Sequence, residues 1–375
     1  MEIRQSVNSS IPQSLCLVVP GRLDSLTGGY IYDRRIVEGL RRRGWSCDVH
    51  EIDAGFPFPS PAALEHANRV LTVIPDGTVV LVDGLAFGAM PDLVERHAVR
   101  LRFVPIVHLP LAADVGLDTA TAERLRTSEA QALSRAALVV VTGKAALPLL
   151  AGYDIPRERI LLVEPGTDRD SGPDSTILAG GRTARYRADA ATRLLCVATL
   201  NPGKGHEILM RSLALLPNRD WHLTCVGSLT RHPSTAGQIL ALVGVLGLER
   251  RVLFLGELDA THLAQEYDRA DVFVLPTLRE TYGMAVAEAI AHELPVVSTT
   301  TGAIPELVGD EAGLLLPPGD TEAFTAALGR VLDDPDLRQR MASASARARL
   351  RLPSWEQAVE TMAAALTSRL SLAVP

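Results

Sequence analysis

The feature that most constrains the fold is a regular alternation of short apolar, β-branched runs with longer segments of helical composition, beginning about residue 14. Alternation of this kind predicts parallel strands joined by crossover helices, that is, doubly wound α/β sheets. We expect two series of strands, one in each half of the chain. They cover residues 15–19, 48–52, 79–82, 102–107, 138–142 and 160–163, then residues 194–199, 221–226, 252–255, 272–275, 296–299 and 314–316.

A polar stretch rich in glycine, serine and aspartate separates the two series, from residue 169 to residue 191. Such a composition is typical of a linker. Because 375 residues are too many for one typical core, the linker predicts two domains, residues 1–168 and residues 192–354, each built on its own sheet. A final helix is expected within residues 355–375, where apolar residues recur at helical spacing.

Composition and charge limit the class of protein. The net charge of −7 argues against nucleic acid as the main partner, because neutralising phosphates requires a basic excess. The cysteines form no CxxC pair, so we expect buried free thiols in a reducing cytoplasm, with no disulfide framework and no zinc site. No apolar window approaches the length of a membrane span, and residues 5–14 lack the apolar core of a signal peptide.

The most informative stretch lies where the strand at residues 272–275 is expected to pass through a short loop into a helix over residues 283–292. A helix N-terminus offers unpaired N–H groups and the positive end of the helix dipole, which together suit a phosphate. Glu280 lies in the loop, and Glu288 lies roughly one and a half turns into the helix. Carboxylates repel phosphate but accept hydrogen bonds from hydroxyl groups, so the pattern predicts a phosphate-linked sugar.

A second strand-to-helix turn, Pro202-Gly203-Lys204-Gly205, follows the strand at residues 194–199. Its glycines leave space for an anion, and Lys204 supplies a compact positive charge to meet that anion. We therefore expect Lys204 at a phosphate group, with a solvated turn lysine as the alternative.

Candidates in the first domain stand at the carboxyl ends of predicted strands, where open parallel sheets bind ligands. Gly28 and Gly29 begin a helix after the first strand, and glycine there permits close approach of the backbone to a ligand. The segment is not a GxGxxG fingerprint, which argues against a dehydrogenase. His108 follows the fourth strand, with a satisfied core histidine as the alternative, and Asp83 follows the third as a weaker candidate.

The second-domain motifs carry a family resemblance. Glu280 and Glu288, with Tyr282-Gly283 between them and Pro276-Thr277 ahead, resemble the donor-site signature of the retaining glycosyltransferases of family 4, which have the GT-B fold. The resemblance implies two Rossmann-like domains facing one another across a cleft, and a last helix that crosses back to the first domain. It also implies transfer of a hexose from a nucleoside diphosphate sugar. It covers the second domain well and the first domain more sparsely.

On this resemblance the site residues take separate roles. Catalytic contributions are expected from His108 beside the donor sugar, Lys204 at the diphosphate and Glu280 at the hydroxyls of the transferred sugar. Glu288 is expected to bind the ribose, and the remaining donor-binding residues are Gly28, Gly29, Thr199, Gly283, Met284 and Ala285, together with Lys204. The family usually has an arginine at the position of Thr199, which leaves open whether Arg22 or Arg279 shares the diphosphate.

Cofactors and partners follow from the same resemblance. The Asp168-Arg169-Asp170 triplet lies at the linker entry without a carboxylate cluster, so we expect no obligatory metal and no other cofactor. No carboxylate is an evident nucleophile, so same-face substitution is expected, with the departing phosphate taking the acceptor's proton.

The acceptor and the exact activity stay open. Arginines between residues 34 and 43 favour a solvated face, with an acceptor phosphate or weak contact with an anionic membrane surface as alternatives, so a phosphorylated or lipid-linked acceptor is a candidate. A nucleotide-sugar epimerase of the same fold and a nucleotide-binding protein without turnover are the alternative functions. The sequence does not determine the base, the sugar or the oligomeric state.

Overall fold

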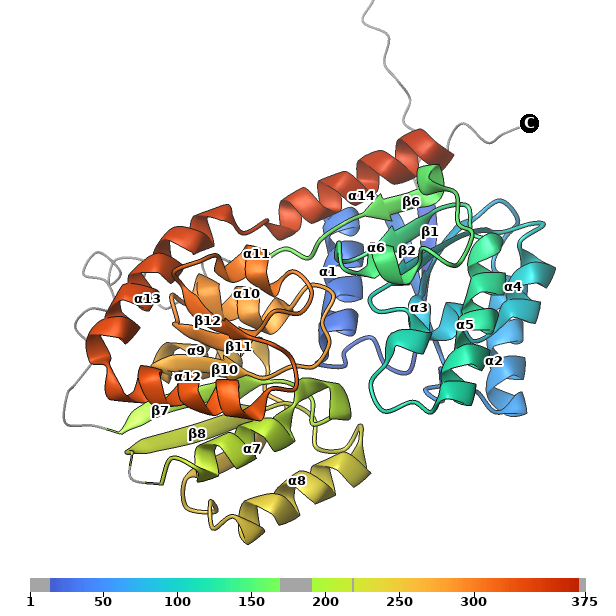
Figure 1. Ribbon diagram of the computed structural model, residues 1–375. Coiled ribbons are helices and arrows are strands. Elements are labelled where there is room, and N and C mark those ends of the chain that lie inside the picture. The colour runs from blue at the N-terminus through green and yellow to red at the C-terminus, as the bar shows by residue number, and fades with distance from the viewer. Residues whose placement is uncertain (1–13, 169–190, 218, 371–375) are drawn as a thin grey trace, which may run out of the picture.

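The structure is a computed structural model that describes residues 14–168, 191–217 and 219–370. It contains two six-stranded parallel sheets, one in each half of the chain, each flanked by helices (Figure 1). Every predicted strand is present with small shifts at its ends, so the predicted fold class is confirmed. The predicted linker falls almost entirely outside the described residues.

The first sheet has the strand order β2-β1-β3-β4-β5-β6. Its strands are β1 (Ser14–Pro20), β2 (Ser46–Ile52), β3 (Val79–Asp83), β4 (Arg102–Val107), β5 (Val139–Val141) and β6 (Ile160–Leu162). Its helices are α1 (Gly28–Arg42), α2 (Pro61–Val73), α3 (Gly84–Phe87), α4 (Pro91–His97), α5 (Thr119–Ser134) and α6 (Ala146–Leu149).

The second sheet has the strand order β12-β11-β10-β7-β8-β9. Its strands are β7 (Thr192–Val197), β8 (Trp221–Val226), β9 (Val252–Gly256), β10 (Val272–Leu275), β11 (Val296–Thr299) and β12 (Gly313–Leu316). Its helices are α7 (His206–Ala214), α8 (Pro233–Val245), α9 (Ala260–Arg269), α10 (Met284–Ala291), α11 (Ile304–Val308), α12 (Thr321–Asp333) and α13 (Pro335–Ala348).

The apolar runs become strands because parallel strands covered by helices are buried on both faces. All four residues of β10 are buried, as are those of β11. Each half of the chain has its own hydrophobic core, and the core of the second half gathers around Trp221 and Phe273. All four cysteines are free and buried, as predicted.

The last helix, α14 (Trp355–Leu370), packs against α1 rather than against the second sheet (Figure 1). Met362 and Trp355 belong to the same apolar cluster as Leu40 of α1. At Gly39 a Cβ atom would lie 2.2 Å from Cγ2 of Val359, so glycine allows the two helices to approach closely. The chain therefore returns to the first domain at its end. None of the helices in the described ranges has the length and apolarity needed to span a bilayer.

Candidate functional site

A cavity of about 440 Å³ lies between the two sheets, at the carboxyl ends of their strands. The first sheet contributes residues after β1, β4 and β5, and the second sheet contributes residues after β7, β8, β9 and β10. This is the edge at which open α/β sheets bind ligands, and the volume lies within the usual range for small-molecule sites.

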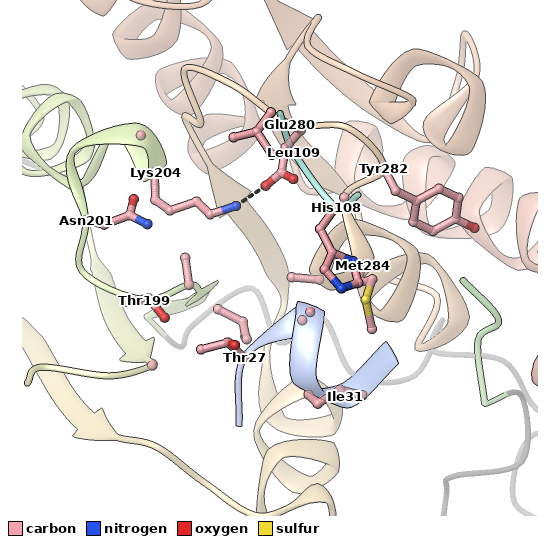
Figure 2. Close-up of a pocket in the computed structure, with 18 of the residues that line it drawn as sticks. Thr27, Ile31, His108, Leu109, Thr199, Asn201, Lys204, Glu280, Tyr282 and Met284 are labelled. Carbon is pink, nitrogen blue, oxygen red and sulfur yellow. Dashed lines mark hydrogen bonds and ion pairs between the residues drawn. The ribbon is translucent and has the colours of Figure 1, made fainter. Parts of the chain in front are cut away.

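The residues assigned catalytic or donor-binding roles line this cavity and come from both domains, and Figure 2 labels His108, Lys204 and Glu280 among them. The first domain supplies Gly28, Gly29 and His108, and the second supplies Thr199, Lys204, Glu280, Gly283, Met284, Ala285 and Glu288. The structure thus brings these ten positions together, whereas the weaker candidate Asp83 is buried beside His108 and is not among the lining residues. The functional role of each residue stays a prediction.

Helix α10 begins at Met284, and its N-cap residue Gly283 has a φ of +100°, in the left-handed region that favours glycine. No side chain caps this end of the helix. A Cβ atom at Gly283 would also lie only 3.2 Å from Cγ1 of Ile304. The local sequence therefore produces a helix start that lines the cavity and that no side chain among the described residues caps, an arrangement that suits a phosphate.

Lys204 stands at the end of a short 3-10 turn (Pro202–Lys204) that precedes α7. Gly205 follows with φ of +70°, and a Cβ atom there would lie 2.0 Å from the carbonyl oxygen of Pro276. Two hydrogen bonds to the carbonyl oxygen of Gly203, from the N–H of Leu278 at 2.7 Å and from Oγ1 of Thr277 at 3.1 Å, join this turn to the loop after β10. The two loops that carry the proposed donor-binding groups are therefore held together.

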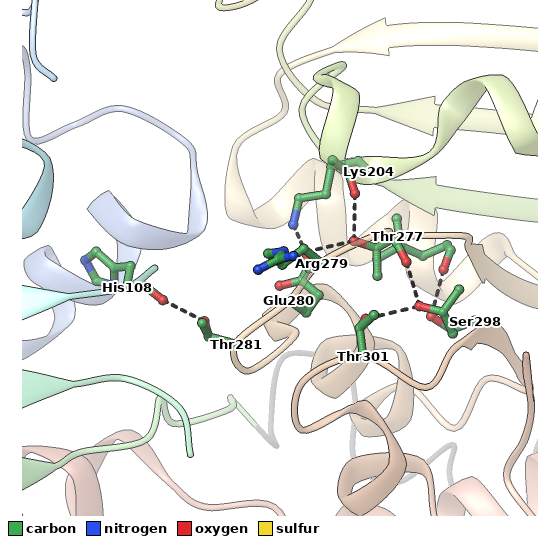
Figure 3. A network of polar contacts seen from close by, with 11 residues as sticks. His108, Lys204, Thr277, Arg279, Glu280, Thr281, Ser298 and Thr301 are labelled. Carbon is green, nitrogen blue, oxygen red and sulfur yellow. Dashed lines mark hydrogen bonds and ion pairs between the residues drawn. The ribbon is translucent and has the colours of Figure 1, made fainter. Parts of the chain in front are cut away.

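The ammonium group of Lys204 forms an ion pair with the carboxylate of Glu280 (Figures 2 and 3). The two residues lie on the loops joined through Gly203, and both side chains are largely buried. An anion that binds Lys204 has to compete with this carboxylate.

Glu288 lies one turn inside α10 and accepts a hydrogen bond from the hydroxyl of Tyr267 at 2.8 Å. The same hydroxyl lies 3.2 Å from the carbonyl oxygen of Ala285. Burial raises the pKa of Glu288, although the Tyr267 hydrogen bond acts in the opposite direction. The carboxylate is thus held in position on the cavity wall.

His108 follows β4, and its carbonyl oxygen accepts a hydrogen bond of 2.7 Å from Oγ1 of Thr281, which links the two domains (Figure 3). Its ring packs edge-on against Tyr32, with centroids 5.3 Å apart. A Cβ atom at Gly29 would lie 3.1 Å from Cδ2 of the ring, so glycine leaves room for the imidazole. Burial lowers the pKa of His108, but the carboxylates of Asp33 and Asp83 outweigh burial and raise it above its ordinary value.

Sequence reasoning missed two charged residues. Arg231 lines the cavity from the loop after β8, and its guanidinium lies 5.4 Å from the centre of the Tyr30 ring in α1. The signal was available, because Arg231 lies at the carboxyl end of a predicted strand. Arg279 also lines the cavity, whereas Arg22 is exposed, pairs with Asp24 and is not among the lining residues.

Asp33 is the second missed residue. It is fully buried on α1, next to His108, and three ligand-type atoms from Asp33, Asp83 and His108 lie within 4.8 Å of one another. In the sequence Asp33 directly precedes Arg34 and Arg35 of the same helix, and no motif distinguishes it from these surface charges. In the aspartate triplet at the linker entry, Asp168 pairs with Arg35, and residues 169 and 170 lie outside the described part of the chain.

Residues 191–334 match the family model described as "Glycosyl transferases group 1". The D-inositol 3-phosphate glycosyltransferase of Corynebacterium glutamicum is 30% identical over 232 residues, which cover 60% of this chain and 56% of that protein. The MMP alpha-(1->4)-mannosyltransferase of Mycolicibacterium hassiacum is 28% identical over 339 residues, which cover 85% of this chain and 78% of that protein. In several of the curated relatives the aligned region is little more than half of the protein.

Solved structures of other proteins share the fold. Sucrose-phosphate synthase from Thermosynechococcus elongatus has a TM-score of 0.79 at 23% identity, with 96% of this chain and 100% of that chain covered. Anabaena Alr3699/HepE in complex with UDP-glucose has a TM-score of 0.72 at 18% identity, with 94% and 100% covered. These comparisons confirm the predicted GT-B fold and the predicted family resemblance, and the names of the relatives support the expectation of a transferase enzyme.

Proposed function

We propose that this chain, whose residues 191–334 form a group 1 glycosyltransferase domain within a GT-B fold, transfers a hexose from a nucleoside diphosphate sugar with retention of anomeric configuration. One observation carries the proposal. The start of α10, Lys204 and the glutamates Glu280 and Glu288 converge on one cavity at the carboxyl ends of the strands. That set offers groups for anions beside acceptors for sugar hydroxyls.

The main catalytic effect in this proposal is electrostatic stabilisation of the leaving diphosphate. Breaking the anomeric bond develops negative charge on the diphosphate, and Lys204 together with the N–H groups at residues 283–285 would meet that charge. The diphosphate would also draw Lys204 from its ion pair with Glu280. Glu280 would then be available to accept hydrogen bonds from hydroxyls of the transferred sugar, while Glu288 accepts from the ribose.

Retention would proceed by substitution on one face of the sugar. Glu288 is engaged by the hydroxyl of Tyr267 and is assigned to the ribose, and Glu280, once Lys204 has moved to the diphosphate, is assigned to hydroxyls of the transferred sugar, so neither is proposed as a covalent nucleophile. The departing phosphate would therefore take the proton of the acceptor hydroxyl. In this scheme no metal ion is obligatory, because Lys204 and the helix start supply the positive charge.

The family usually has an arginine at the position of Thr199, and in this proposal another cation of the cavity wall takes its role. Thr199 lines the cavity but carries no charge. Arg231 and Arg279 both line it, and Arg231 reaches toward α1 of the first domain, so it is the stronger candidate to share the diphosphate with Lys204.

Names of similar proteins suggest the first ligands to test. HepE is described in complex with UDP and with UDP-glucose, and several relatives are named D-inositol 3-phosphate glycosyltransferase. UDP-glucose is therefore the first donor and inositol 3-phosphate the first acceptor to assay. A lipid-linked acceptor and weak contact with an anionic membrane surface stay as candidates.

The test is a thermal-shift panel with the diphosphates of uridine, guanosine and adenosine beside NAD, followed by a donor-consumption assay. A cognate diphosphate at ~100 times its dissociation constant should add ~2.7 kcal/mol to the free energy of unfolding. Donor consumption that requires an acceptor supports the transferase. Consumption without an acceptor points to an epimerase, and tight binding without consumption points to a nucleotide-binding protein.

A further inference from the structure

The first domain's side of the cleft holds two buried carboxylates behind a single histidine. Asp33, on α1, is 0% exposed, and Asp83, at the end of β3, is 1% exposed. His108 lies between them and the cavity, which it lines. The three residues come from α1, from the end of β3 and from the segment after β4, and the first sheet places them together at one edge.

The contacts within this group are unequal. Nε2 of His108 lies 3.2 Å from Oδ1 of Asp33 and 4.0 Å from Oδ2 of Asp83. Oδ1 of Asp83 also accepts a hydrogen bond of 2.7 Å from the N–H of Leu85, at the start of α3. Oδ2 of Asp33 is buried and, within the part of the chain that the structure describes, has no hydrogen-bond partner. The polar contacts of Asp33 are thus with Nε2 of His108 and with the neighbouring carboxyl group of Asp83.

The charges of this group do not balance without a cation. Two neighbouring buried carboxylates cannot both ionise at low cost, because burial and mutual repulsion oppose the second charge. Burial, and then the charge of Asp33, raise the pKa of Asp83 to about 7. Among the described residues, no arginine or lysine forms an ion pair with either carboxylate, which leaves the imidazole of His108 as the group that can carry the positive charge.

The other titratable groups around His108 do not supply that charge. Tyr32 packs against the imidazole, and burial raises its pKa well above the ordinary value. Burial, with the charge of Asp83, raises the pKa of Tyr30 to about 12. Arg231 from the second domain lies over the Tyr30 ring, and Thr281 contacts only the backbone of His108. Both phenols are thus neutral near neutral pH.

We propose that Asp33 and Asp83 act as a pair of positioning residues that hold His108 as an imidazolium at the cavity wall, so that Nδ1–H is presented to an anionic oxygen of the bound donor. In a neutral ring whose Nε2–H is donated to Asp33, Nδ1 would be an acceptor and would repel such an oxygen. A second proton on the ring converts Nδ1 into a charged hydrogen-bond donor. The hydrogen bond from Nδ1–H to the bound nucleotide sugar rests on the proposed function, whereas the protonation of the ring does not.

The proton balance is closed within the group. In this proposal the ring carries one positive charge near neutral pH, which balances one negative charge on the pair of carboxyl groups, and the pair retains one proton. Neutralising one carboxylate by amidation removes the reason for the charged ring. Asp33→Asn keeps the size of the side chain, and Asp83→Asn keeps an oxygen for the N–H of Leu85.

The decisive experiment is a pH titration of the His108 ring by NMR in the full chain, with its signal assigned by its loss in His108→Gln. We expect a pKa above the ordinary value of about 6.5. Asp33→Asn should lower that pKa by about one unit or more, and Asp83→Asn should lower it by less, because Nε2 lies farther from Asp83. Asp76→Asn, whose side chain is 81% exposed, is the matched control and should leave the titration unchanged. If Asp33→Asn does not fold, Asp83→Asn carries the same test.

A His108 pKa at or below its ordinary value, or one that neither variant lowers, would overturn the proposal. A second arm adds Mn²⁺ or Zn²⁺ to the unliganded chain, because the same three residues have metal-ligand character. Stoichiometric binding that either aspartate variant abolishes would reassign the group as a metal site. A third arm titrates the diphosphates of uridine, guanosine and adenosine in turn. The expected His108 titration with binding of none of the three would refute the proposed function alone, and nucleotide binding with an uncharged ring would refute this inference alone.

Discussion

The ion pair between Lys204 and Glu280 joins the loop after β7 to the loop after β10, and it is formed by two of the groups assigned to catalysis. Each neutralises the other in the structure. A diphosphate carries more negative charge than one carboxylate and would compete successfully for Lys204. Donor binding would then separate the pair, with Lys204 at the diphosphate and Glu280 at the sugar.

Lys204→Ala should lower turnover by ~10²-fold or more, because it deletes a preorganised charge that meets the leaving group. The measurement is donor-saturation kinetics. Lys144→Ala is the matched control, since Lys144 is 53% exposed, pairs with Glu306 and is not among the cavity-lining residues. Equal kinetics for Lys204→Ala and the wild type would contradict a catalytic role and leave Lys204 only its ion pair with Glu280.

Arg231→Ala should weaken binding of the cognate nucleoside diphosphate by about tenfold, or ~1.4 kcal/mol, because it removes a charged donor from the wall that also holds Thr199. Calorimetric titration gives the affinity. Arg22→Ala removes an exposed arginine outside the cavity lining and should bind like the wild type. A loss confined to the Arg22 variant, or shared equally by both, would contradict the assignment of Arg231.

The two glutamates should separate kinetically. Glu288→Gln should mainly raise the donor KM and weaken nucleoside diphosphate binding, because the ribose changes little during reaction. Glu280→Gln should mainly lower kcat and leave the affinity for the free nucleotide nearly intact, because it addresses the sugar that gains charge. Donor-saturation kinetics and calorimetric titration of both variants decide. Nucleotide affinity lost in Glu280→Gln and kept in Glu288→Gln would reverse the two roles.

Activity should persist in a strong chelator, because Lys204 and the start of α10 supply the positive charge that a metal would otherwise provide. The assay follows donor consumption with and without chelator, using the untreated enzyme as the reference. Complete loss of activity that magnesium or manganese restores would refute metal independence.

Glu129 should make the fold less stable as the pH rises. It is buried on α5, accepts hydrogen bonds from the N–H of Leu111 at 2.9 Å and the hydroxyl of Tyr153 at 3.1 Å, and burial raises its pKa to about 7. The folded chain therefore holds the proton more tightly than the unfolded chain. That contribution is complete below the unfolded pKa of about 4.5 and is lost as the pH rises through about 7.

Glu129→Gln mimics the protonated form and should be more stable than the wild type at about pH 8, by about 1 to 3 kcal/mol, and similar to it at about pH 5. Urea unfolding at both pH values measures the difference. Glu123→Gln changes an exposed glutamate of the same helix that pairs with Arg126, and it should not reproduce this gain at high pH. Parallel pH profiles for the wild type and Glu129→Gln would contradict the prediction.

The sequence by itself determined the positions of the helices and strands. It also determined the local shape of the two turns that lead into α7 and α10, where phosphate groups are expected. The strands were predictable because parallel strands covered by helices need continuous apolar runs, as in β10. The starts of α7 and α10 were predictable because Gly205 and Gly283 adopt positive φ, which a glycine signals locally. The predicted site residues could be found from the sequence because they follow the carboxyl ends of strands, and the end of a strand is marked by the residues around it.

The tertiary structure alone decided which of these groups meet. The strand order places β10 beside β7, and only that order pairs Lys204 with Glu280, which are 76 positions apart. The packing of α1 on the first sheet places Asp33 beside His108, at a separation of 75 positions, and the packing of one domain against the other places Arg231 over Tyr30. Hydrophobic periodicity records which face of an element is buried, but it carries no record of the neighbour that covers that face. Contacts between distant polar side chains depend on that neighbour, so they follow from the packing of the whole chain.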